Sequence, residues 1–184
     1  MQESPNHAES NVVSADRRRI RQELLATPAR ELIRLFRDLP PPTLEEMHGE
    51  LRATLLDQGS TVANLFGRTA IHAPGSWLAK AFEPLSSGQG HGYNAFRVRR
   101  GVRRMFRMRT FVGPSRLDEG HAYHLDYSAF NWGPMGTMWD EVRKLDDDIY
   151  LGLGRVGYTK RQRRHLMPFL LEGPADPFVP PERW

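Results

Sequence analysis

Residues 105–154 form a series of short segments in which apolar and polar side chains alternate, and turn residues separate these segments. In segment 105–112, positions 106, 108, 110 and 112 share one face, and positions 107, 109 and 111 share the other. This period of two is typical of a strand with one buried face. The link 113–120, GPSRLDEG, has the composition of a turn. We therefore expect consecutive antiparallel strands that can close around a small ligand.

Segment 121–128 repeats this alternation, with positions 123, 125 and 127 on one face and positions 124, 126 and 128 on the other. About eight such segments occur, and eight strands are enough for a small closed barrel to hold one small ligand. The expected fold class is therefore mainly β with N-terminal helices (α+β), built around an antiparallel β-barrel. The eight segments are residues 50–56, 77–84, 93–100, 105–112, 121–128, 137–145, 148–156 and 165–171.

Apolar residues with helical spacing occur before the first predicted strand and between the first and second predicted strands. Thr27 is predicted to cap a helix that has Pro28 at its first position and apolar side chains at 32, 35, 36 and 39. We expect this helix to pack on the barrel or to plug one end. Thr43 and Glu46 have capping-box spacing, and residues 62–70 have the spacing of a further helix after Ser60.

The chain is expected to fold as one domain with tails, because 184 residues can bury a substantial core. Residues 1–15 are polar and aperiodic, which predicts a disordered leader. Residues 16–48 are expected to hold the helices, residues 49–172 the barrel, and residues 173–184 an extended proline-rich tail.

Composition excludes several kinds of site. The chain has no cysteine, which excludes disulfides, thiolate nucleophiles and thiolate metal ligands. No apolar run approaches the roughly 20 residues of a membrane span, and the amino terminus lacks the apolar core of a signal peptide. We therefore expect a cytoplasmic protein with no membrane span.

Most of the positive charge of the chain comes from arginine. Only Lys80, Lys144 and Lys160 are lysines, so 23 of the 26 basic residues are arginines. The basic clusters lack the interleaved aromatic residues of a strand-binding surface, and we predict no nucleic-acid partner.

Two stretches of the chain, LPPPTLEEMHGELRA and WDEVRKLDDDIYLGLG, resemble the bacterial GXWXG-type lipocalin-like proteins, which carry a companion C-terminal domain of unknown function. Members have a leucine-proline lead into a short acidic helix, a glycine-started strand, a helix, a WYGK-like strand and a late hairpin. The WYGK-like strand corresponds to WLAK, residues 77–80. At residues 49–53 this chain has GELRA, with leucine and alanine in place of the name-giving tryptophan and second glycine. The resemblance implies a lipocalin-like barrel with an internal cavity, and it implies no established reaction or catalytic residues.

The densest polar constellation lies on segment 121–128 and its neighbours. If His124 and Asp126 point into the barrel, a desolvated carboxylate there would have a raised pKa and could exchange protons with a substrate. Such exchange is what a cofactor-free cyclisation or isomerisation needs. Arg109 could hold a substrate carboxylate or enolate. The candidate catalytic residues are Asp126, His124, Asp140 and Arg109.

The alternative for these charged residues is a solvated outer face. On that hypothesis Arg107, Arg109, Asp126 and Glu141 form cross-strand ion pairs worth at most about 1 kcal/mol each. A shift of one residue in register decides between the two hypotheses. Positions 121 and 124 face opposite ways on a strand, so the histidines there do not predict a metal site.

Aromatic side chains are expected to line an apolar pocket. The loop 128–138, SAFNWGPMGTM, places Phe130, Trp132 and Met135 among glycine and proline, which suggests a lid or a homodimer contact. The candidate ligand-binding residues are Trp77, Phe96, Tyr123, Tyr127, Phe130, Trp132, Trp139 and Tyr150.

These patterns together predict a barrel that binds a small, largely apolar metabolite and promotes a cofactor-free acid/base cyclisation or isomerisation in specialised metabolism. No cofactor is expected. Two alternatives stay open: a carrier of a lipid-like or haem-like ligand, and an interaction protein whose barrel is filled by its own side chains. Polar candidates inside the barrel favour the enzyme, whereas a purely apolar lining favours the carrier.

Overall fold

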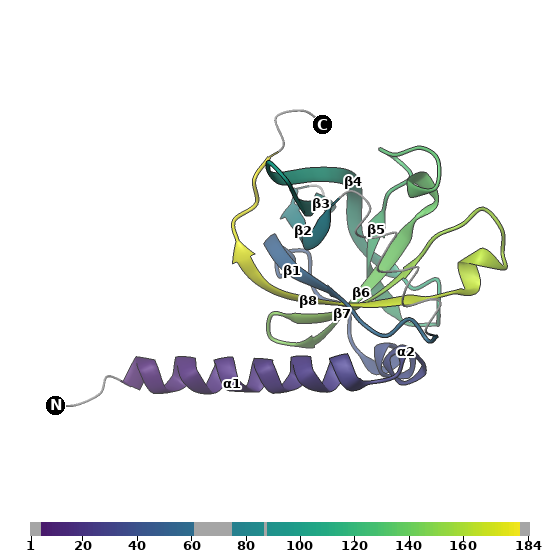
Figure 1. The fold of residues 1–184 in the computed structure, drawn as a ribbon. Helices are drawn as coiled ribbons and strands as arrows, with labels where there is room; N and C mark the ends of the chain where they lie inside the picture. The colour runs from purple at the N-terminus through teal and green to yellow at the C-terminus, as the bar shows by residue number, and fades with distance from the viewer. Residues whose placement is uncertain (1–4, 61–74, 87, 181–184) are drawn as a thin grey trace.

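Eight strands form a closed antiparallel barrel in the computed structural model, which describes residues 5–60, 75–86 and 88–180 (Figure 1). Each strand pairs with the next in the chain, and the last pairs with the first, so the sheet has no free edge. The predicted barrel of about eight strands is confirmed. The strands are β1 (Gly49–Leu55), β2 (Ser76–Pro84), β3 (Gly90–Val98), β4 (Gly101–Pro114), β5 (His121–Asp126), β6 (Trp139–Asp146), β7 (Ile149–Arg155) and β8 (Met167–Asp176).

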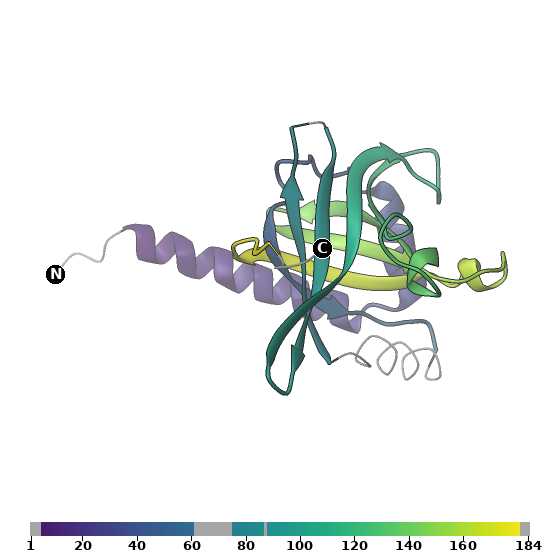
Figure 2. The ribbon, with the colours of Figure 1, turned by 90° about the horizontal axis from the view of Figure 1, so that it is seen from above.

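The barrel is formed by two strongly inclined parts, since β2, β3 and β4 run across the direction of β6, β7 and β8 (Figure 2). Short 3-10 turns, η1 (Met135–Thr137) and η2 (Gln162–Arg164), lie in the long loops before β6 and β8. The strand β8 continues to Asp176, past the predicted barrel boundary at residue 172.

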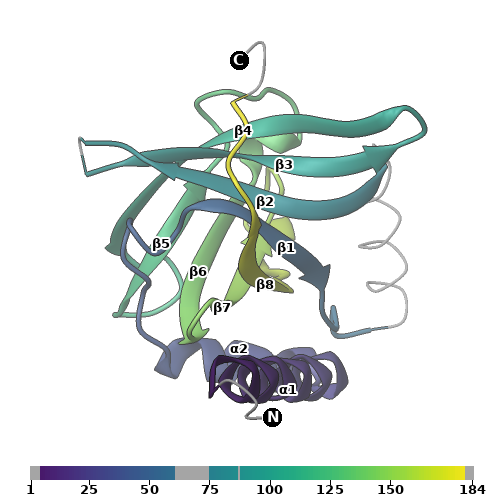
Figure 3. The same ribbon diagram turned by 90° about the vertical axis from the view of Figure 1, so that its left-hand side faces the viewer.

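Two helices, α1 (Pro5–Ala26) and α2 (Ala29–Asp38), lie beneath β7 and β8 (Figure 3). Leu32 and Phe36 of α2 are fully buried against the outer face of β7 and β8, as the helical spacing predicted. Residues 5–15, for which the sequence predicted a disordered leader, are helical. The second half of α1 is attached to the barrel by ion pairs from Arg17 to Asp148 and from Arg21 to Glu172.

The start of α2 differs from the prediction. Pro28 occupies the N-cap position, and Thr27 instead donates its hydroxyl to the carbonyl of Glu23. The carboxylate of Asp57, which follows β1, accepts a 2.9 Å hydrogen bond from the backbone N–H of Ala29. A residue distant in sequence therefore satisfies a free donor of the helix terminus. The capping box between Thr43 and Glu46 is confirmed. The helix predicted at residues 62–70 lies outside the described residues.

Arg143 fixes the other end of α2 to the barrel. Its side chain is fully buried, and its guanidinium donates to the carbonyls of Phe36 and Arg37 at 2.9 and 2.8 Å. The same group donates to Asp118 at 2.6 Å, in the loop between β4 and β5. One side chain thus satisfies the last carbonyls of a helix and holds a loop.

The C-terminal segment crosses the outside of the barrel over β2 and β3 (Figure 3). There the hydroxyl of Tyr93 accepts a hydrogen bond from the backbone N–H of Val179 at 3.1 Å, and the Tyr93 and Phe178 rings lie 5.0 Å apart. This segment covers a row of small side chains on the outer face of the sheet, namely Ala79, Ala81 and Ala95.

The barrel interior is packed mainly with aromatic and aliphatic side chains. The inward-facing positions Gly152 and Gly154 of β7 carry no side chain. A Cβ on Gly152 would lie 2.1 Å from the ring of Phe169, and a Cβ on Gly154 would lie 2.8 Å from Oδ1 of Asp140. The two glycines therefore leave the space that Phe169 and Asp140 occupy. Among the described residues, no helix is both long and apolar enough to span a membrane.

Candidate functional site

Four polar side chains meet inside the barrel, one from each of four strands or their ends. Lys80 of β2 lies opposite Asn94 of β3 in the strand register. Asp140 of β6 lies opposite Leu125 of β5, whose side chain is in the core, and Tyr127 follows directly after β5. An irregularity in β2 between Trp77 and Ala79 turns Lys80 to the same side as Trp77. We call Lys80, Asn94, Tyr127 and Asp140 the inner cluster.

The ammonium group of Lys80 makes all of its hydrogen bonds within the inner cluster. Its Nζ lies 2.9 Å from Oδ2 of Asp140, 3.1 Å from Oδ1 of Asn94 and 2.5 Å from the hydroxyl oxygen of Tyr127. The side chains of Lys80 and Asp140 are 2% and 0% exposed. An ammonium group has three N–H donors, and here each has an acceptor.

Tyr127 and Asn94 complete the hydrogen-bond network. The Tyr127 hydroxyl donates to Oδ2 of Asp140 at 3.1 Å and accepts from Nδ2 of Asn94 at 3.1 Å. The indole N–H of Trp77 donates to Oδ1 of Asn94 at 3.1 Å. The polar hydrogens of Lys80 and Tyr127 are therefore directed at partners within the cluster, and Asn94 is held from two sides.

One atom of the inner cluster has no hydrogen-bond partner among the described residues, and it is Oδ1 of Asp140. Both hydrogen bonds to this carboxylate go to Oδ2. Oδ1 lies instead beside Gly154, where no side chain intervenes. Because a buried carboxylate oxygen is costly to leave without a donor, this atom is a candidate contact for a ligand.

The surroundings of the inner cluster are apolar. The ammonium of Lys80 lies 5.2 to 5.3 Å from the ring centroids of Trp77, Tyr127 and Phe169. Burial lowers the pKa of Lys80 below 10.5, and the charge of Asp140 opposes this effect only in part. Burial and the nearby Asp140 raise the pKa of Tyr127 well above 10. Perturbed ionisable groups in an apolar interior are typical of a site that handles protons or charge.

Of the four candidate catalytic residues, Asp140 lies in the interior, and His124, Asp126 and Arg109 lie on the outer face of the barrel. Asp126 pairs with Arg109 at 2.9 Å and accepts hydrogen bonds from the backbone N–H and hydroxyl of Ser128. Burial alone would raise the pKa of Asp126, but the bonds from Ser128 and Arg109 outweigh it and hold the pKa below its usual value. This arrangement is the cross-strand ion pair of the outer-face alternative.

His124 belongs to a second polar group, which we call the outer cluster: His124, Glu141, Trp139, Ser115 and Arg116. The indole N–H of Trp139 donates to Nδ1 of His124 at 3.1 Å, so the imidazole proton is on Nε2, which donates to the Pro114 carbonyl at 3.0 Å. Burial lowers the pKa of His124. Glu141 accepts from the Ser115 hydroxyl at 2.6 Å and from the Arg116 N–H at 2.8 Å. The outer cluster thus holds the loop between β4 and β5.

The candidate ligand-binding aromatics fall into three groups. Phe130 and Trp132 lie on the loop between β5 and β6, and their side chains are 43% and 92% exposed. Trp139 packs on the outer face against His124 and Phe111. The interior group consists of Trp77, Phe96, Tyr123, Tyr127 and Tyr150.

Sequence reasoning did not select Lys80 or Asn94. Strict alternation places Lys80 on the face opposite Trp77, and the irregularity in β2 reverses this. Two signals in the sequence were available: Lys80 is one of only three lysines, and it ends the WLAK segment that carries the family resemblance. Among the described residues, no three histidine, aspartate or glutamate side chains are grouped closely enough to hold a metal ion.

Comparison with known proteins gives one informative result. No family model matches the chain, and no curated protein matches it. The chain is similar to the solved structure of a protein from Thermomonospora curvata, at 17% sequence identity and a TM-score of 0.55. The likeness covers 79% of this chain and 87% of that chain. At this identity the comparison supports the barrel fold and carries no information on activity.

Proposed function

We propose that the barrel binds a small, largely apolar metabolite and that Asp140 acts on it as a general base in a cofactor-free isomerisation or cyclisation. This proposal rests on one observation: the two carboxylate oxygens of Asp140 differ in their hydrogen bonds. Oδ2 is held by Lys80 and Tyr127, whereas the buried Oδ1 has no partner among the described residues.

The hydrogen bonds already made within the inner cluster indicate which chemical group of a ligand would lie next to it. Lys80 and Tyr127 have no spare donor, and Asp140 has one spare acceptor. A ligand group next to Oδ1 therefore carries a proton, as a hydroxyl group does, or as a carbon does when it is acidified by a neighbouring carbonyl. The rest of the ligand contacts aromatic and aliphatic side chains.

The chemistry needs no further reagent. Oδ1 takes the proton from the substrate, and in an isomerisation the same carboxyl group returns it to a different carbon. In a cyclisation the hydroxyl oxygen loses its proton to Oδ1 and adds to the β-carbon of a conjugated carbonyl in the same molecule, so the carbon–carbon π bond breaks. The protonated carboxyl group then returns the proton to the α-carbon, and nothing leaves the molecule. Nζ of Lys80 lies 2.9 Å from Oδ2 of Asp140 in a fully buried site, where electrostatic interactions are strong.

Access requires side-chain movement, because Asp140 is fully buried. The partly buried side chains packed against the interior include Met105, Met135, Met138 and Phe106. Methionine side chains are unbranched and adapt readily to a new neighbour. Met135 and Met138 belong to the loop between β5 and β6, directly before the strand that carries Asp140. This loop is therefore the proposed entry, and it is the loop for which the sequence suggested a lid or a homodimer contact.

The test begins with native mass spectrometry of the protein from its own host, followed by identification of any molecule that denaturation releases. The expected result is a stoichiometric apolar metabolite with a hydroxyl or carbonyl group. Asp140→Asn should then lower turnover of its precursor by about 100-fold or more, the usual contribution of a general base. Asp126→Asn is the matched control, since it makes the same change on the outer face and should leave turnover intact.

A second variant separates catalysis from folding. Asp140→Asn leaves the ammonium of Lys80 without a counter-charge, so the double variant Lys80→Met with Asp140→Asn removes both charges. A folded double variant with full turnover would refute the role of Asp140. Equal loss of turnover in Asp126→Asn would also refute it.

One observation favours a second candidate function, the interaction protein with a filled barrel. Phe82, Tyr123, Leu125 and Leu171 are all 0% exposed, which is what a self-filled interior requires. An empty protein from its own host that gains no thermal stability from a broad metabolite panel would support this alternative.

We also propose membership of the GXWXG-type lipocalin-like family. Lys80 and Asp140, the partners of the buried ion pair, both lie in segments that belong to the resemblance: the WYGK-like strand WLAK and the stretch WDEVRKLDDDIYLGLG. Measuring whether members with this lysine and this aspartate bind the same metabolite class tests the proposal.

A further inference from the structure

Two neighbouring loops form an exposed surface that the barrel interior does not explain. They are residues 127–138, between β5 and β6, and residues 156–166, between β7 and β8. The backbone N–H of Gly157 donates to the hydroxyl of Thr137 at 3.0 Å, and the loops lie side by side in two views (Figures 1 and 2). We call residues 127–138 and 156–166 the loop pair.

The loop pair exposes large aromatic side chains. Trp132 is 92% exposed, Tyr158 is 63% exposed and Phe130 is 43% exposed. The loop 127–138 has no charged residue, and glycine and proline follow Trp132 directly. Exposed aromatic side chains that are grouped on two neighbouring loops are typical of an interaction surface.

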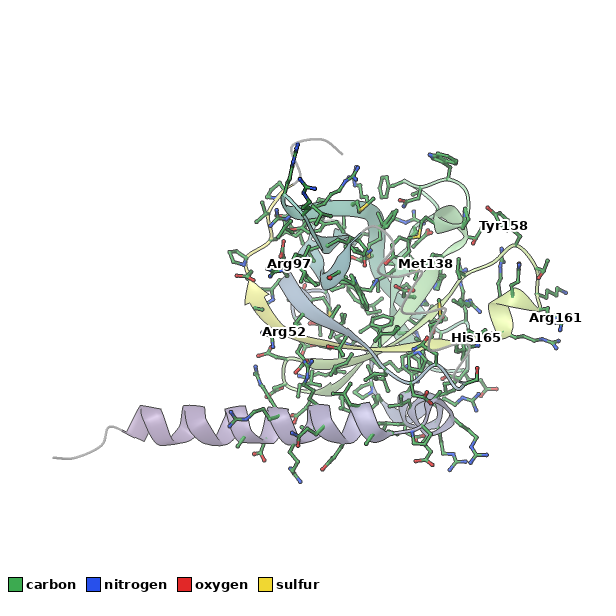
Figure 4. The ribbon with its side chains drawn as sticks, viewed as in Figure 1. Arg52, Arg97, Met138, Tyr158, Arg161 and His165 are labelled. Carbon is green, nitrogen blue, oxygen red and sulfur yellow. The ribbon has the colours of Figure 1, made fainter. Side chains whose placement is uncertain are left out.

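The second loop supplies positive charge. Residues 156–166 contain Lys160, Arg161, Arg163 and Arg164 and no acidic residue, and all four cations are exposed. Tyr158 and Arg161 project away from the barrel (Figure 4). The guanidinium of Arg107 lies 4.0 Å from the ring centroid of Phe130, which brings a further cation to the aromatic loop.

The adjoining surface is also positive. Burial and the nearby guanidinium groups of Arg155 and Arg163 lower the pKa of Arg116, although Asp126 and Glu141 oppose this effect. Between Arg155 and Leu171 the sequence contains no acidic residue. The loop pair and its surroundings therefore complement an anionic partner.

We propose that the loop pair docks on the surface of an anionic phospholipid bilayer. Trp132, Phe130 and Tyr158 lie at the headgroup level, where amphipathic aromatic rings are favoured. The cations of residues 160–164 contact the anionic headgroups, each contributing to attraction at the surface. This docking goes beyond the proposed function and holds whether or not the barrel contains a metabolite. It also places the expected entry loop of the barrel against a source of apolar molecules.

The arrangement favours a bilayer over a nucleic acid. Single-stranded nucleic acids stack their bases on aromatic rings that alternate with cations along a groove. Here the most exposed ring is on a neutral loop and most of the cations are on the neighbouring one. This separation matches a membrane interface, where rings enter the headgroup layer and cations remain at its surface.

The test is co-sedimentation of the full chain with phosphatidylcholine vesicles and with vesicles that also contain phosphatidylserine. We expect binding to the phosphatidylserine vesicles, a fall in binding with added salt, and weak binding to phosphatidylcholine alone. Reversing two charges with Lys160→Glu and Arg161→Glu should weaken binding by about tenfold or more. Trp132→Ala should weaken binding and remove most of the blue shift in tryptophan fluorescence.

The matched control is Arg99→Glu with Arg100→Glu, which makes the same charge change in the turn between β3 and β4. That turn lies at a different end of the molecule from the loop pair (Figure 2). Leu85→Ala, at an exposed apolar residue of the turn before β3, controls for Trp132. Equal losses in both charge variants would overturn the proposal, as would an absence of vesicle binding at low salt. Binding only to a single-stranded oligonucleotide, with the same sensitivity to the loop variants, would also overturn it.

Discussion

The inner and outer clusters each contain a buried carboxylate on β6, at the adjacent positions Asp140 and Glu141. They differ in how their hydrogen bonds are completed. Both oxygens of Glu141 accept from the loop between β4 and β5. Oδ1 of Asp140 accepts from no described residue, and the donors of Lys80 and Tyr127 are already used.

This difference separates a structural cluster from a candidate site. Each face of β6 has a buried carboxylate, so burial and charge alone do not identify a functional site. The outer cluster is complete and connects a loop to the barrel. The inner cluster is complete except for one acceptor. The functional hypothesis therefore rests on Oδ1 of Asp140, the oxygen that accepts no hydrogen bond from the described residues.

The largest expected difference between the two faces is in the cost of breaking an ion pair. Lys80→Met leaves the carboxylate of Asp140 buried without its counter-charge and should lower the free energy of unfolding by about 3–5 kcal/mol. Arg109→Met removes the partially exposed partner of Asp126 and should cost under about 1 kcal/mol. Urea denaturation of both variants measures the difference. Equal costs would show that the inner pair is solvated. The double variant Lys80→Met with Asp140→Leu should recover most of the lost stability.

The next effect concerns the space beside Asp140. Gly154→Ala places a methyl group 2.8 Å from Oδ1 and should cost about 1–3 kcal/mol, because the carboxylate must move. Gly113→Ala, on β4, meets its nearest atom at 3.4 Å, in the ring of Phe111, and should change stability by no more than about 0.5 kcal/mol. Thermal unfolding compares the two. A neutral Gly154→Ala would mean that Asp140 has a second stable position.

A smaller effect should appear in the outer cluster. Glu141→Gln loses one of the two acceptors for the loop between β4 and β5 and should lower stability by about 1–2 kcal/mol. The exchange of the Arg116 amide hydrogen should accelerate, because its acceptor is weakened. Asp140→Asn should leave that exchange rate unchanged when global stability is matched. Faster exchange in both variants would show that the clusters are coupled across the sheet.

The smallest effect is a dependence of stability on pH that comes from Asp126, the outer-face carboxylate paired with Arg109. The pKa of Asp126 is held below its usual 3.8 in the folded state, so the unfolded chain binds more protons between the two values. The stability that Asp126 contributes is therefore complete above pH 3.8 and is lost as the pH falls through the folded pKa. Unfolding of the wild type and of Asp126→Asn at several acidic pH values should show their difference shrinking in that window. A constant difference would contradict the assignment.

The strands could be predicted from the sequence because their alternation is regular. Tyr123, Leu125 and Tyr127 share one face, as the alternation predicted, and the structure shows that this face points inward, which the alternation had left open. Asp140 was among the candidates. The orientation of Asp126 could not be predicted, because a charged residue can be buried on the outer face when a loop and partners cover it. Asp126 is 3% exposed and His124 is 1% exposed, although neither points into the barrel.

Lys80 shows the limit of period-two reasoning. The irregularity between Trp77 and Ala79 is a property of the pairing of two strands, and one strand's sequence does not contain it. The cap of α2 is similar, since Asp57 supplies it from 28 positions further along the chain. Gly152 and Gly154 were a readable signal, because two glycines on one face of a strand indicate that a neighbour fills their space.

The pairing of β1 with β8 has a consequence for the order of folding. Ala53 of β1 lies opposite Leu171 of β8, and α2 packs on β7 and β8. The first strand and the helix before it therefore depend on contacts with the last strands of the chain. During synthesis, β1 and α2 cannot find these partners until residues 167–176 have left the ribosome. Contacts so distant in sequence slow folding, because the intervening chain must be ordered first. One edge of β1, which pairs with β2 on its other edge, therefore stays unpaired through most of the synthesis of the chain, and chaperone binding to that edge is expected during that interval.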